Sequence, residues 1–397
     1  PGTRRLGMTL AVVLGLALLG WFKYAGFFGE MLHALLPVVP VPQVTLPIGI
    51  SFFTFQGLSY VIDVYRGDAA VQRDPLKLAL YIAFFPQLVA GPIVRYTTVA
   101  EEIDERHESV SEFSAGAVRF LFGLGKKMLL ANAVARIADA AFAAVMPSVL
   151  FAWLGAVAYT FQIYFDFSAY SDMAIGLGRM FGFHFLENFN YPYVARSVTE
   201  FWRRWHISLS TWFRDYVYIP LGGNRCSRAR NVWNLFVVWF LTGMWHGASW
   251  NFIAWGLWFF VLLVGEKFLW GKALERLPSL VRHAYAMVLV VFSWVLFRAE
   301  TLTAAAAYFA AMFGSSGVWC GSRAVYYALE FWPELLCCCI AALPVKQWLE
   351  TALQKRDAAP ARAVLTWGPK LAAMALLACS YCKLVTGSFN PFIYFRF

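Results

Sequence analysis

Leu241-Thr-Gly-Met-Trp-His246-Gly-Ala-Ser-Trp250 sets a histidine among apolar and aromatic residues, inside a longer hydrophobic stretch. A second histidine lies forty residues earlier, in Ser197-Val-Thr-Glu-Phe-Trp-Arg-Arg-Trp-His206-Ile-Ser-Leu-Ser-Thr-Trp-Phe-Arg-Asp215. An ionisable group is expensive to place within a membrane segment, so such a group is by default a functional-site hypothesis. The two stretches therefore indicate both a membrane-embedded fold and the place of its chemistry.

The composition of the whole chain is typical of a membrane protein. Of its 397 residues, 60% are hydrophobic and 14% are charged, whereas a soluble domain is about 45–50% apolar and about 25% charged. A soluble protein with this many apolar segments would need a charged shell that the chain lacks. A bilayer-spanning helix needs about 20 mostly apolar residues. We therefore predict an all-α polytopic protein with roughly 8–10 transmembrane or re-entrant helices.

Apolar segments follow one another along the chain without a fixed repeat, so residues 1–397 are predicted to form a single membrane domain. In the first segment, Trp21, Lys23 and Tyr24 are predicted to anchor the helix at the membrane interface. The predicted segments are Leu6–Phe28, Leu46–Tyr65, Leu76–Val94, Phe113–Ala144, Val149–Phe183, Asn231–Leu263, Tyr285–Phe297, Leu335–Leu343 and Val364–Leu384.

The net charge of +10 is the excess of Lys and Arg that cytoplasmic loops of membrane proteins carry. The basic residues are scattered along the chain and form no stripe that could follow phosphates, so no nucleic-acid partner is predicted. Cys379 and Cys382 form a C-x-x-C within an apolar run. We interpret them as small apolar helix residues rather than as a redox or metal motif.

The segment around His206 is predicted to be one amphipathic helix that does not span the membrane. Ser197-Val-Thr-Glu200 is a capping box and marks the start of the helix. The large residues from Phe201 to Tyr216 then recur on one side at helical spacing, and Pro220-Leu-Gly-Gly-Asn224 ends the helix.

Other polar side chains are predicted at membrane depth. The carboxylate of Asp166 and the hydroxyl of Ser168 need partners there, because burying them unpaired is costly. Lys126 and Lys127 are predicted to extend toward the lipid headgroups; contact with an anionic ligand is the alternative.

Three kinds of chemistry compete for the two histidines. A histidine-rich metal centre is disfavoured, because no two of the six histidines lie within five residues of each other, and no metal site is predicted. A proton or ion relay through Asp166, Asp172, Arg204 and His206 remains open, although no pair of related halves is visible in the sequence.

The third chemistry is acyl transfer. A neutral imidazole, with an ordinary pKa of about 6.5, can take the proton from an acceptor hydroxyl as its oxygen attacks a thioester. Hydrogen-bond donors nearby would stabilise the resulting oxyanion. The candidate donors are Trp205, Trp245, Ser249 and Asn251.

At these residues the sequence resembles the membrane-bound O-acyltransferase family, and within it the bacterial alginate O-acetyltransferase branch. The similarity is dense between Leu46 and Ala299 and sparse over residues 300–388. The matching stretches include Leu46-Pro-Ile-Gly-Ile-Ser-Phe-Phe, Phe85-Pro-Gln-Leu-Val-Ala-Gly-Pro, Tyr164-Phe-Asp-Phe-Ser-Ala-Tyr-Ser-Asp, Glu200-Phe-Trp-Arg-Arg-Trp-His, Leu221-Gly-Gly-Asn-Arg, Trp245-His-Gly and Asn390-Pro-Phe-Ile-Tyr-Phe.

This resemblance implies that His246 is the essential catalytic residue and that His206 is the second catalytic histidine. It implies a ring of tilted helices around a central funnel in the bacterial plasma membrane. Acetyl-CoA or a related thioester would be the cytoplasmic donor, with no bound cofactor, and an exported polysaccharide the acceptor, aided by an extracytoplasmic SGNH-type partner. The expected substrate-binding residues are Asp166, Ser168, Arg203, Arg204, Trp205, Arg214, Trp245, Ser249 and Asn251. Among them, Asp166 and the three arginines are expected to pair with one another.

Two alternatives stay open on the sequence alone. One is transfer of D-alanyl or another acyl group to a cell-wall polymer, and the other is a transporter of acyl groups or polymer that breaks no bond. Members of the family usually have further membrane helices before the segment that matches Leu6–Phe28, so we expect the chain to lack N-terminal helices of the family.

Overall fold

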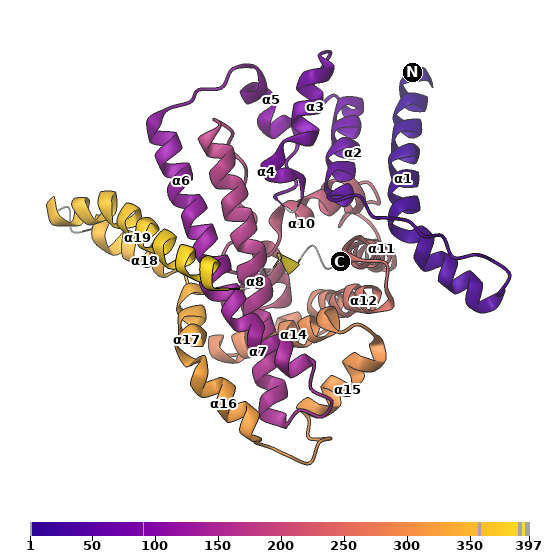
Figure 1. The fold of residues 1–397 in the computed structure, drawn as a ribbon. Helices are drawn as coiled ribbons and strands as arrows, with labels where there is room; N and C mark the ends of the chain where they lie inside the picture. The colour runs from indigo at the N-terminus through magenta and orange to yellow at the C-terminus, as the bar shows by residue number, and fades with distance from the viewer. Residues whose placement is uncertain (1, 90, 356–358, 388–390, 394–397) are drawn as a thin grey trace.

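The computed structural model describes residues 2–89, 91–355, 359–387 and 391–393. Within these ranges every regular element is a helix, as the composition predicts (Figure 1). The helices of the N-terminal half are α1 (Gly2–Leu35), α2 (Ile50–Arg66), α3 (Pro75–Ala83), α4 (Phe85–Leu88), α5 (Tyr96–Asp104), α6 (Val110–Gly125), α7 (Asn132–Phe142) and α8 (Val149–Met180).

The C-terminal half continues with shorter helices and a final long one. They are α9 (Val198–Arg204), α10 (Ile207–Phe213), α11 (Arg228–His246), α12 (Trp250–Gly265), α13 (Gly271–Glu275), α14 (Ser279–Arg298), α15 (Leu302–Met312), α16 (Ser322–Glu330), α17 (Trp332–Ala341), α18 (Val345–Gln354) and α19 (Ala359–Thr386). Short π-helical segments η1 (Lys126–Ala131), η3 (Arg214–Tyr218) and η4 (Glu266–Trp270) and the 3₁₀ turn η2 (Pro192–Val194) connect some of them.

Among the described residues, five helices are long and apolar enough to cross a membrane, and a sixth span is possible if the bent pair α16 and α17 counts as one. The five are α1, α8, α14, α19 and the continuous helix Trp250–Glu275. Roughly 8–10 transmembrane or re-entrant helices were expected. The difference arises because several predicted segments are short, broken or polar: the predicted segment Leu76–Val94, for example, is divided into α3 and α4 at Phe84.

The long helix α8 is the centre of the fold, and α6, η1 and α7 run along it (Figure 1). Glycines allow the close approach of α6 and α8: a Cβ on Gly116 would lie 2.5 Å from the Gly176 carbonyl oxygen, and a Cβ on Gly123 would lie 2.8 Å from that of Ala169. Small residues at helix interfaces are the usual means of tight packing between membrane helices.

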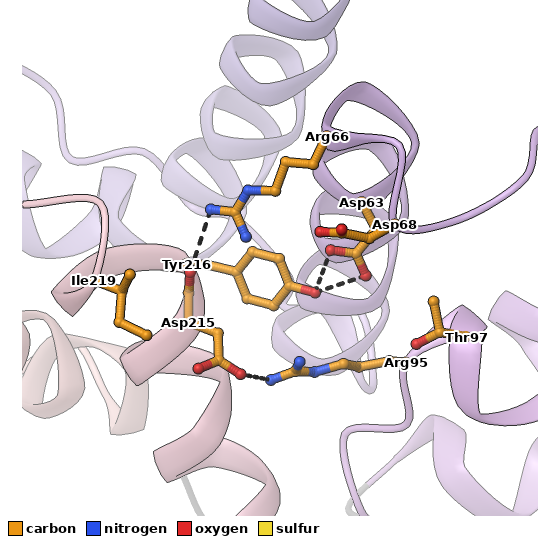
Figure 2. A pocket seen from close by; sticks show the side chains of 8 residues that line it. All are labelled: Asp63, Arg66, Asp68, Arg95, Thr97, Asp215, Tyr216 and Ile219. Carbon is orange, nitrogen blue, oxygen red and sulfur yellow. Dashed lines mark hydrogen bonds and ion pairs between the residues drawn. The ribbon is translucent and has the colours of Figure 1, made fainter.

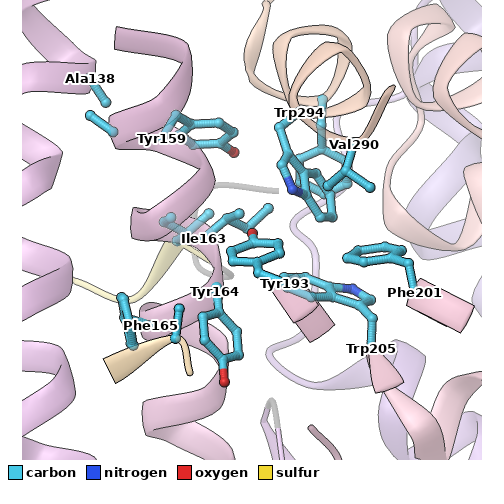
Figure 3. Close-up of a cluster of buried hydrophobic side chains, with 14 of the residues drawn as sticks. Ala138, Tyr159, Ile163, Tyr164, Phe165, Tyr193, Phe201, Trp205, Val290 and Trp294 are labelled. Carbon is cyan, nitrogen blue, oxygen red and sulfur yellow. The ribbon is translucent and has the colours of Figure 1, made fainter. Parts of the chain in front are cut away.

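The largest aromatic cluster joins α8, η2, α9 and α14 (Figure 3). Tyr193 lies between Tyr164 of α8 and Phe201 of α9, and its hydroxyl donates to the Thr160 carbonyl at 2.6 Å. Trp205 packs against Trp294 of α14, with ring centroids 4.8 Å apart. This cluster fixes the segment that leads into His206.

The lysines predicted to reach the headgroups instead pair with carboxylates of α8. Lys126 lies 2.6 Å from Asp172, which Arg119 also contacts at 2.8 Å. Lys127 is buried and pairs with Asp166. The prediction that Asp166 requires a partner is confirmed. The predicted extension of the lysines toward lipid is wrong, since both ammonium groups lie against carboxylates of α8, and a buried charge is normally paired.

Candidate active site

Both histidines lie at breaks between helices, which the sequence does not suggest. The predicted single helix from Ser197 to Pro220 is wrong: α9 ends at Arg204 and α10 begins at Ile207. The capping interaction at its start is confirmed, since the Ser197 hydroxyl accepts from the Glu200 N–H at 3.0 Å. Between the two helices, His206 has φ 45° and ψ 55°, a left-handed conformation that residues with a Cβ rarely adopt.

Asn188, in the loop after α8, holds this break. Its Oδ1 atom accepts from the N–H of Ser208 at 3.1 Å and from the Ser208 hydroxyl at 2.9 Å. The same oxygen lies 3.2 Å from Nδ1 of His206, an arrangement that suits the tautomer with a proton on Nδ1 and leaves Nε2 as an acceptor. The Asn188 carbonyl also accepts from the Ile207 N–H at 2.9 Å.

His246 is the last residue of α11, and Gly247-Ala-Ser249 separates it from α12. The predicted continuous span Asn231–Leu263 is therefore wrong, because the chain folds back at this point. The two helices cross closely at glycines: a Cβ on Gly243 would lie 2.4 Å from the Phe252 carbonyl oxygen, and one on Gly256 would lie 2.3 Å from that of Trp239.

The two breaks meet at one indole ring. The Trp245 ring centroid lies 5.9 Å from that of His206 and 5.0 Å from that of His246. His246 also contacts Trp255 at 4.8 Å and Phe297 at 5.3 Å. His206 is 3% exposed, whereas His246 is only half-buried. Of the two predicted catalytic residues, His246 is thus the more accessible, and the structure brings both to the same cluster.

Three donors near His246 are buried without a hydrogen-bond partner among the described residues. They are Nε1 of Trp245, Nε1 of Trp255 and the hydroxyl of Ser249. Buried polar groups are normally paired, so these three unpaired donors are candidates to bind a substrate atom that enters this part of the protein. Trp245 and Ser249 were predicted as donors, whereas Trp255 was not.

Other predicted site residues have structural partners instead. The Asn251 amide donates to the carbonyl of Ala299 and joins α12 to the end of α14. Trp205 belongs to the aromatic cluster rather than to the contacts of His246. Asp166 accepts from the Ile393 N–H at 2.6 Å and so holds the C-terminal segment against α8. Ser168 is buried on α8 and its hydroxyl has no partner within the described ranges.

The three predicted arginines do not pair with Asp166 as expected. Arg204 pairs with Glu200 at 2.9 Å, and Arg214 pairs with Asp215 at 2.6 Å. Arg203 is exposed. Sequence neighbours therefore provide the partners of two arginines. Glu200 and Arg204 have the i, i+4 spacing at which helix side chains meet, and Asp215 is the residue after Arg214.

A polar cavity of about 360 Å³ lies elsewhere, at the far end of α2 (Figure 2). Arg66 there is 14 residues, or about 21 Å along α2, from Phe52, which contacts Trp245. Burial raises the pKa of Asp215 in this cavity, but hydrogen bonds from Arg214 and Arg95 outweigh it and hold the pKa below the ordinary value. Its lining residues are Asp63, Arg66, Asp68, Arg95, Thr97, Asp215, Tyr216 and Ile219.

These charges are largely satisfied by one another. Arg95 lies 2.6 Å from Asp215, and the Tyr216 hydroxyl donates to Asp63 at 2.7 Å (Figure 2). The guanidinium groups of Arg66 and Arg95 lie 5.3 and 5.2 Å from the Tyr216 ring centroid. We assign this cavity to the packing of η3 against α2 rather than to the chemistry of the histidines.

Comparison with known proteins defines the class of this fold and site. Residues 69–305, more than half of the chain and including both histidines, match the model of the membrane-bound O-acyltransferase family. The chain belongs to this family. It is an O-acyltransferase and a multi-pass protein of the bacterial inner membrane.

Its relatives include several bacterial acyltransferases. A probable alginate O-acetylase of Azotobacter vinelandii is 42% identical over 98% of this chain and 84% of its own length. A peptidoglycan O-acetyltransferase of Helicobacter pylori is 34% identical over 79% of this chain and 66% of its own. A teichoic acid D-alanyltransferase of Bacillus subtilis is 29% identical over 63% of this chain and 67% of its own.

Proposed function

We propose that the chain transfers an acetyl group from a cytoplasmic thioester, acetyl-CoA or a derivative, toward an exported cell-surface or secreted polysaccharide. The relatives support the acceptor class, since the names of three of them are those of acyltransferases for alginate, peptidoglycan and teichoic acid. The greater identity to the O-acetylase than to the D-alanyltransferase favours acetyl as the acyl group.

The observation that carries the proposal is the half-buried imidazole of His246 among three unpaired donors. In the proposed reaction, His246 takes the proton of an acceptor hydroxyl while the hydroxyl oxygen forms a bond to the thioester carbonyl carbon. Donors such as Nε1 of Trp245 and the Ser249 hydroxyl stabilise the oxyanion. The carbon–sulfur bond then breaks, and the imidazolium returns the proton to the thiolate, so that an ester and a free thiol result.

His206 has a supporting role in this proposal. Its ring contacts Trp245, and its Nδ1 faces Asn188, so Nε2 is the atom left to accept a proton or to orient a substrate hydroxyl. The immediate acceptor is either the polysaccharide itself or the nucleophile of an extracytoplasmic SGNH-type partner. Both acceptors are hydroxyl groups and use the same step.

The test compares cells that produce the wild-type chain, His246→Ala or His107→Ala at equal levels. His107 is exposed and serves as the control histidine. Polysaccharide acetyl content is expected to fall to background with His246→Ala and to stay at the wild-type level with His107→Ala. Unchanged acetylation with His246→Ala would remove this residue from the chemistry.

A second measurement separates an enzyme from a transporter. Membranes that carry the chain are given labelled acetyl-CoA and polysaccharide from the producing strain. Release of free CoA that depends on His246 is expected of an acyltransferase. Movement of label across the membrane without release of CoA would instead indicate transport.

A further inference from the structure

Lys23 lies in the first apolar helix, and its side chain turns toward the neighbouring helices α2 and α11. Its ammonium group donates to the carbonyl of Trp245 and, at 3.1 Å, to the hydroxyl of Ser51 on α2. The neighbouring Tyr24 hydroxyl donates to the Met244 carbonyl at 2.6 Å. The predicted interfacial anchor is therefore wrong for these two residues, because their polar atoms turn inward to the end of α11.

These contacts place α1 over the break that carries His246. Lys23 and Tyr24 contact the last turn of α11, and Phe27 packs edge-to-face on Trp250 at the start of α12, with ring centroids 5.6 Å apart. Most other apolar side chains of α1 are exposed, as is usual for a helix that faces lipid. α1 also packs along α2 through Leu19 and Gly15. Its contacts with the end of α11 are a second set, and they lie at the site.

The last carbonyls of a helix have no partner within the helix, and they carry the negative end of its dipole. A cation at this position satisfies the carbonyl and is stabilised by the dipole. Among the described residues no carboxylate lies within ion-pair distance of Lys23. The carbonyl of Trp245, the hydroxyl of Ser51 and the Trp245 ring, 5.7 Å from Nζ, therefore provide its environment.

We propose that Lys23 is a positioning residue for acyl transfer: it fixes the Trp245 carbonyl, and thereby the indole of Trp245 and the imidazole of His246. The inference rests on the function proposed above. A charged side chain in a lipid-facing helix is costly. A role in holding Trp245, the residue before His246, would explain why the lysine is there. Loss of the ammonium removes this donor from the Trp245 carbonyl, and a displacement of about 1 Å in a catalytic group can lower the rate on the order of 10²-fold.

Arg4 provides a matched control on the same helix. Its guanidinium donates to the carbonyls of Val64 and Tyr65, both at 2.8 Å, and so caps the C-terminus of α2. Arg4 and Lys23 both tie α1 to the end of another helix, but only Lys23 contacts the helix that carries His246. If Lys23 served only to hold α1 against the rest of the protein, Lys23→Met and Arg4→Met would have the same effect on the rate.

The experiment measures the maximal rate and KM for acetyl-CoA in membranes that contain Lys23→Met, Lys23→Arg, Arg4→Met or His246→Ala. With Lys23→Met we expect a maximal rate lower by on the order of 10²-fold and a KM within about twofold of wild type. Lys23→Arg keeps a cation that can donate to the carbonyl and is expected to recover most of the rate. Arg4→Met is expected to keep the wild-type rate.

Two results would overturn the inference while leaving the proposed function intact. One is a wild-type rate for Lys23→Met together with an inactive His246→Ala. The other is an equal loss of maximal rate in Lys23→Met and Arg4→Met, with no recovery of the rate in Lys23→Arg. That result would indicate that Lys23 only holds α1 in place. Activity in His246→Ala contradicts the proposed function instead. The level of folded chain, measured by gel filtration in detergent, is compared for all variants.

Discussion

The imidazole of His206 lies edge-on to the indole of Trp245, with ring centroids 5.9 Å apart and 77° between the ring planes. Trp245 precedes His246 in the chain, so this single contact connects two helix breaks that are forty residues apart. The indole also carries a buried N–H without a partner in the described part of the chain. Trp245 is therefore both the support of the histidine pair and a candidate oxyanion donor.

Trp245→Phe keeps an aromatic ring and removes this N–H. We expect the maximal rate of acetyl transfer to fall on the order of 10²-fold, the usual effect of losing one oxyanion donor, with a smaller change in KM. Trp202→Phe is the control, since Trp202 also has a buried Nε1 without a partner among the described residues but packs on Trp239 and Phe259 rather than on a histidine. Equal rates for the two variants would argue against a role for the Trp245 N–H.

Asn188→Ala removes the acceptor that holds the left-handed turn at His206. Three donors lose their oxygen, and an unsatisfied buried donor costs about 1–3 kcal/mol. We expect lower thermal stability in detergent and a reduced maximal rate. Ser208→Ala is the comparison, because it removes the hydroxyl bonds to Asn188 and to the Ile93 N–H but leaves the contact between Asn188 and His206. A larger loss of rate in Ser208→Ala than in Asn188→Ala would contradict this assignment.

Much of this site could be predicted from the sequence. The two histidines stand out because each lies in a short stretch with polar residues inside a very hydrophobic chain. The cap at Ser197 follows from its spacing to Glu200. Trp245 precedes His246 and Ser249 follows it by three residues, so proximity in the chain alone identifies these donors. Local patterns were sufficient for these groups, but not for Arg204 and Arg214, whose partners Glu200 and Asp215 are also close in sequence.

The helix breaks could not be predicted in this way. The periodicity from Phe201 to Tyr216 continues through His206 without interruption, and the residue that imposes the turn is Asn188, in a different loop. Lys23 was misassigned for a related reason. Its partner is a backbone carbonyl, which every residue has, so no side-chain pattern marks the contact. Trp255 is likewise placed beside His246 only by the crossing of α11 and α12.

The buried pair of Lys127 and Asp166 is predicted to stabilise the fold rather than the reaction. Either Lys127→Met or Asp166→Asn leaves a buried polar or charged group without its partner, and breaking a buried pair costs about 3–5 kcal/mol. The double variant Lys127→Met with Asp166→Asn should lose less stability than the two single losses combined. Thermal unfolding in detergent measures all three, and strict additivity would contradict a direct pairing.

Gly243→Ala tests whether the crossing of α11 and α12 positions His246. The added Cβ would lie 2.4 Å from the Phe252 carbonyl oxygen, a backbone atom that cannot move aside without shifting α12. His246 lies three residues further along α11, and Trp255 is on α12. A shift of α12 relative to α11 would therefore change the contact between these two rings. We expect a loss of maximal rate on the order of 10²-fold and lower thermal stability.

Gly57→Ala is the matched control for this substitution, since no atom lies within 4 Å of the Cβ that it would add to α2. Replacing a helical glycine by alanine at an open position favours the helix by about 0.8–1 kcal/mol, so this variant should be as active as wild type and slightly more stable. If Gly243→Ala behaved like Gly57→Ala in both rate and stability, the close crossing of the two helices would not be what holds His246 in place.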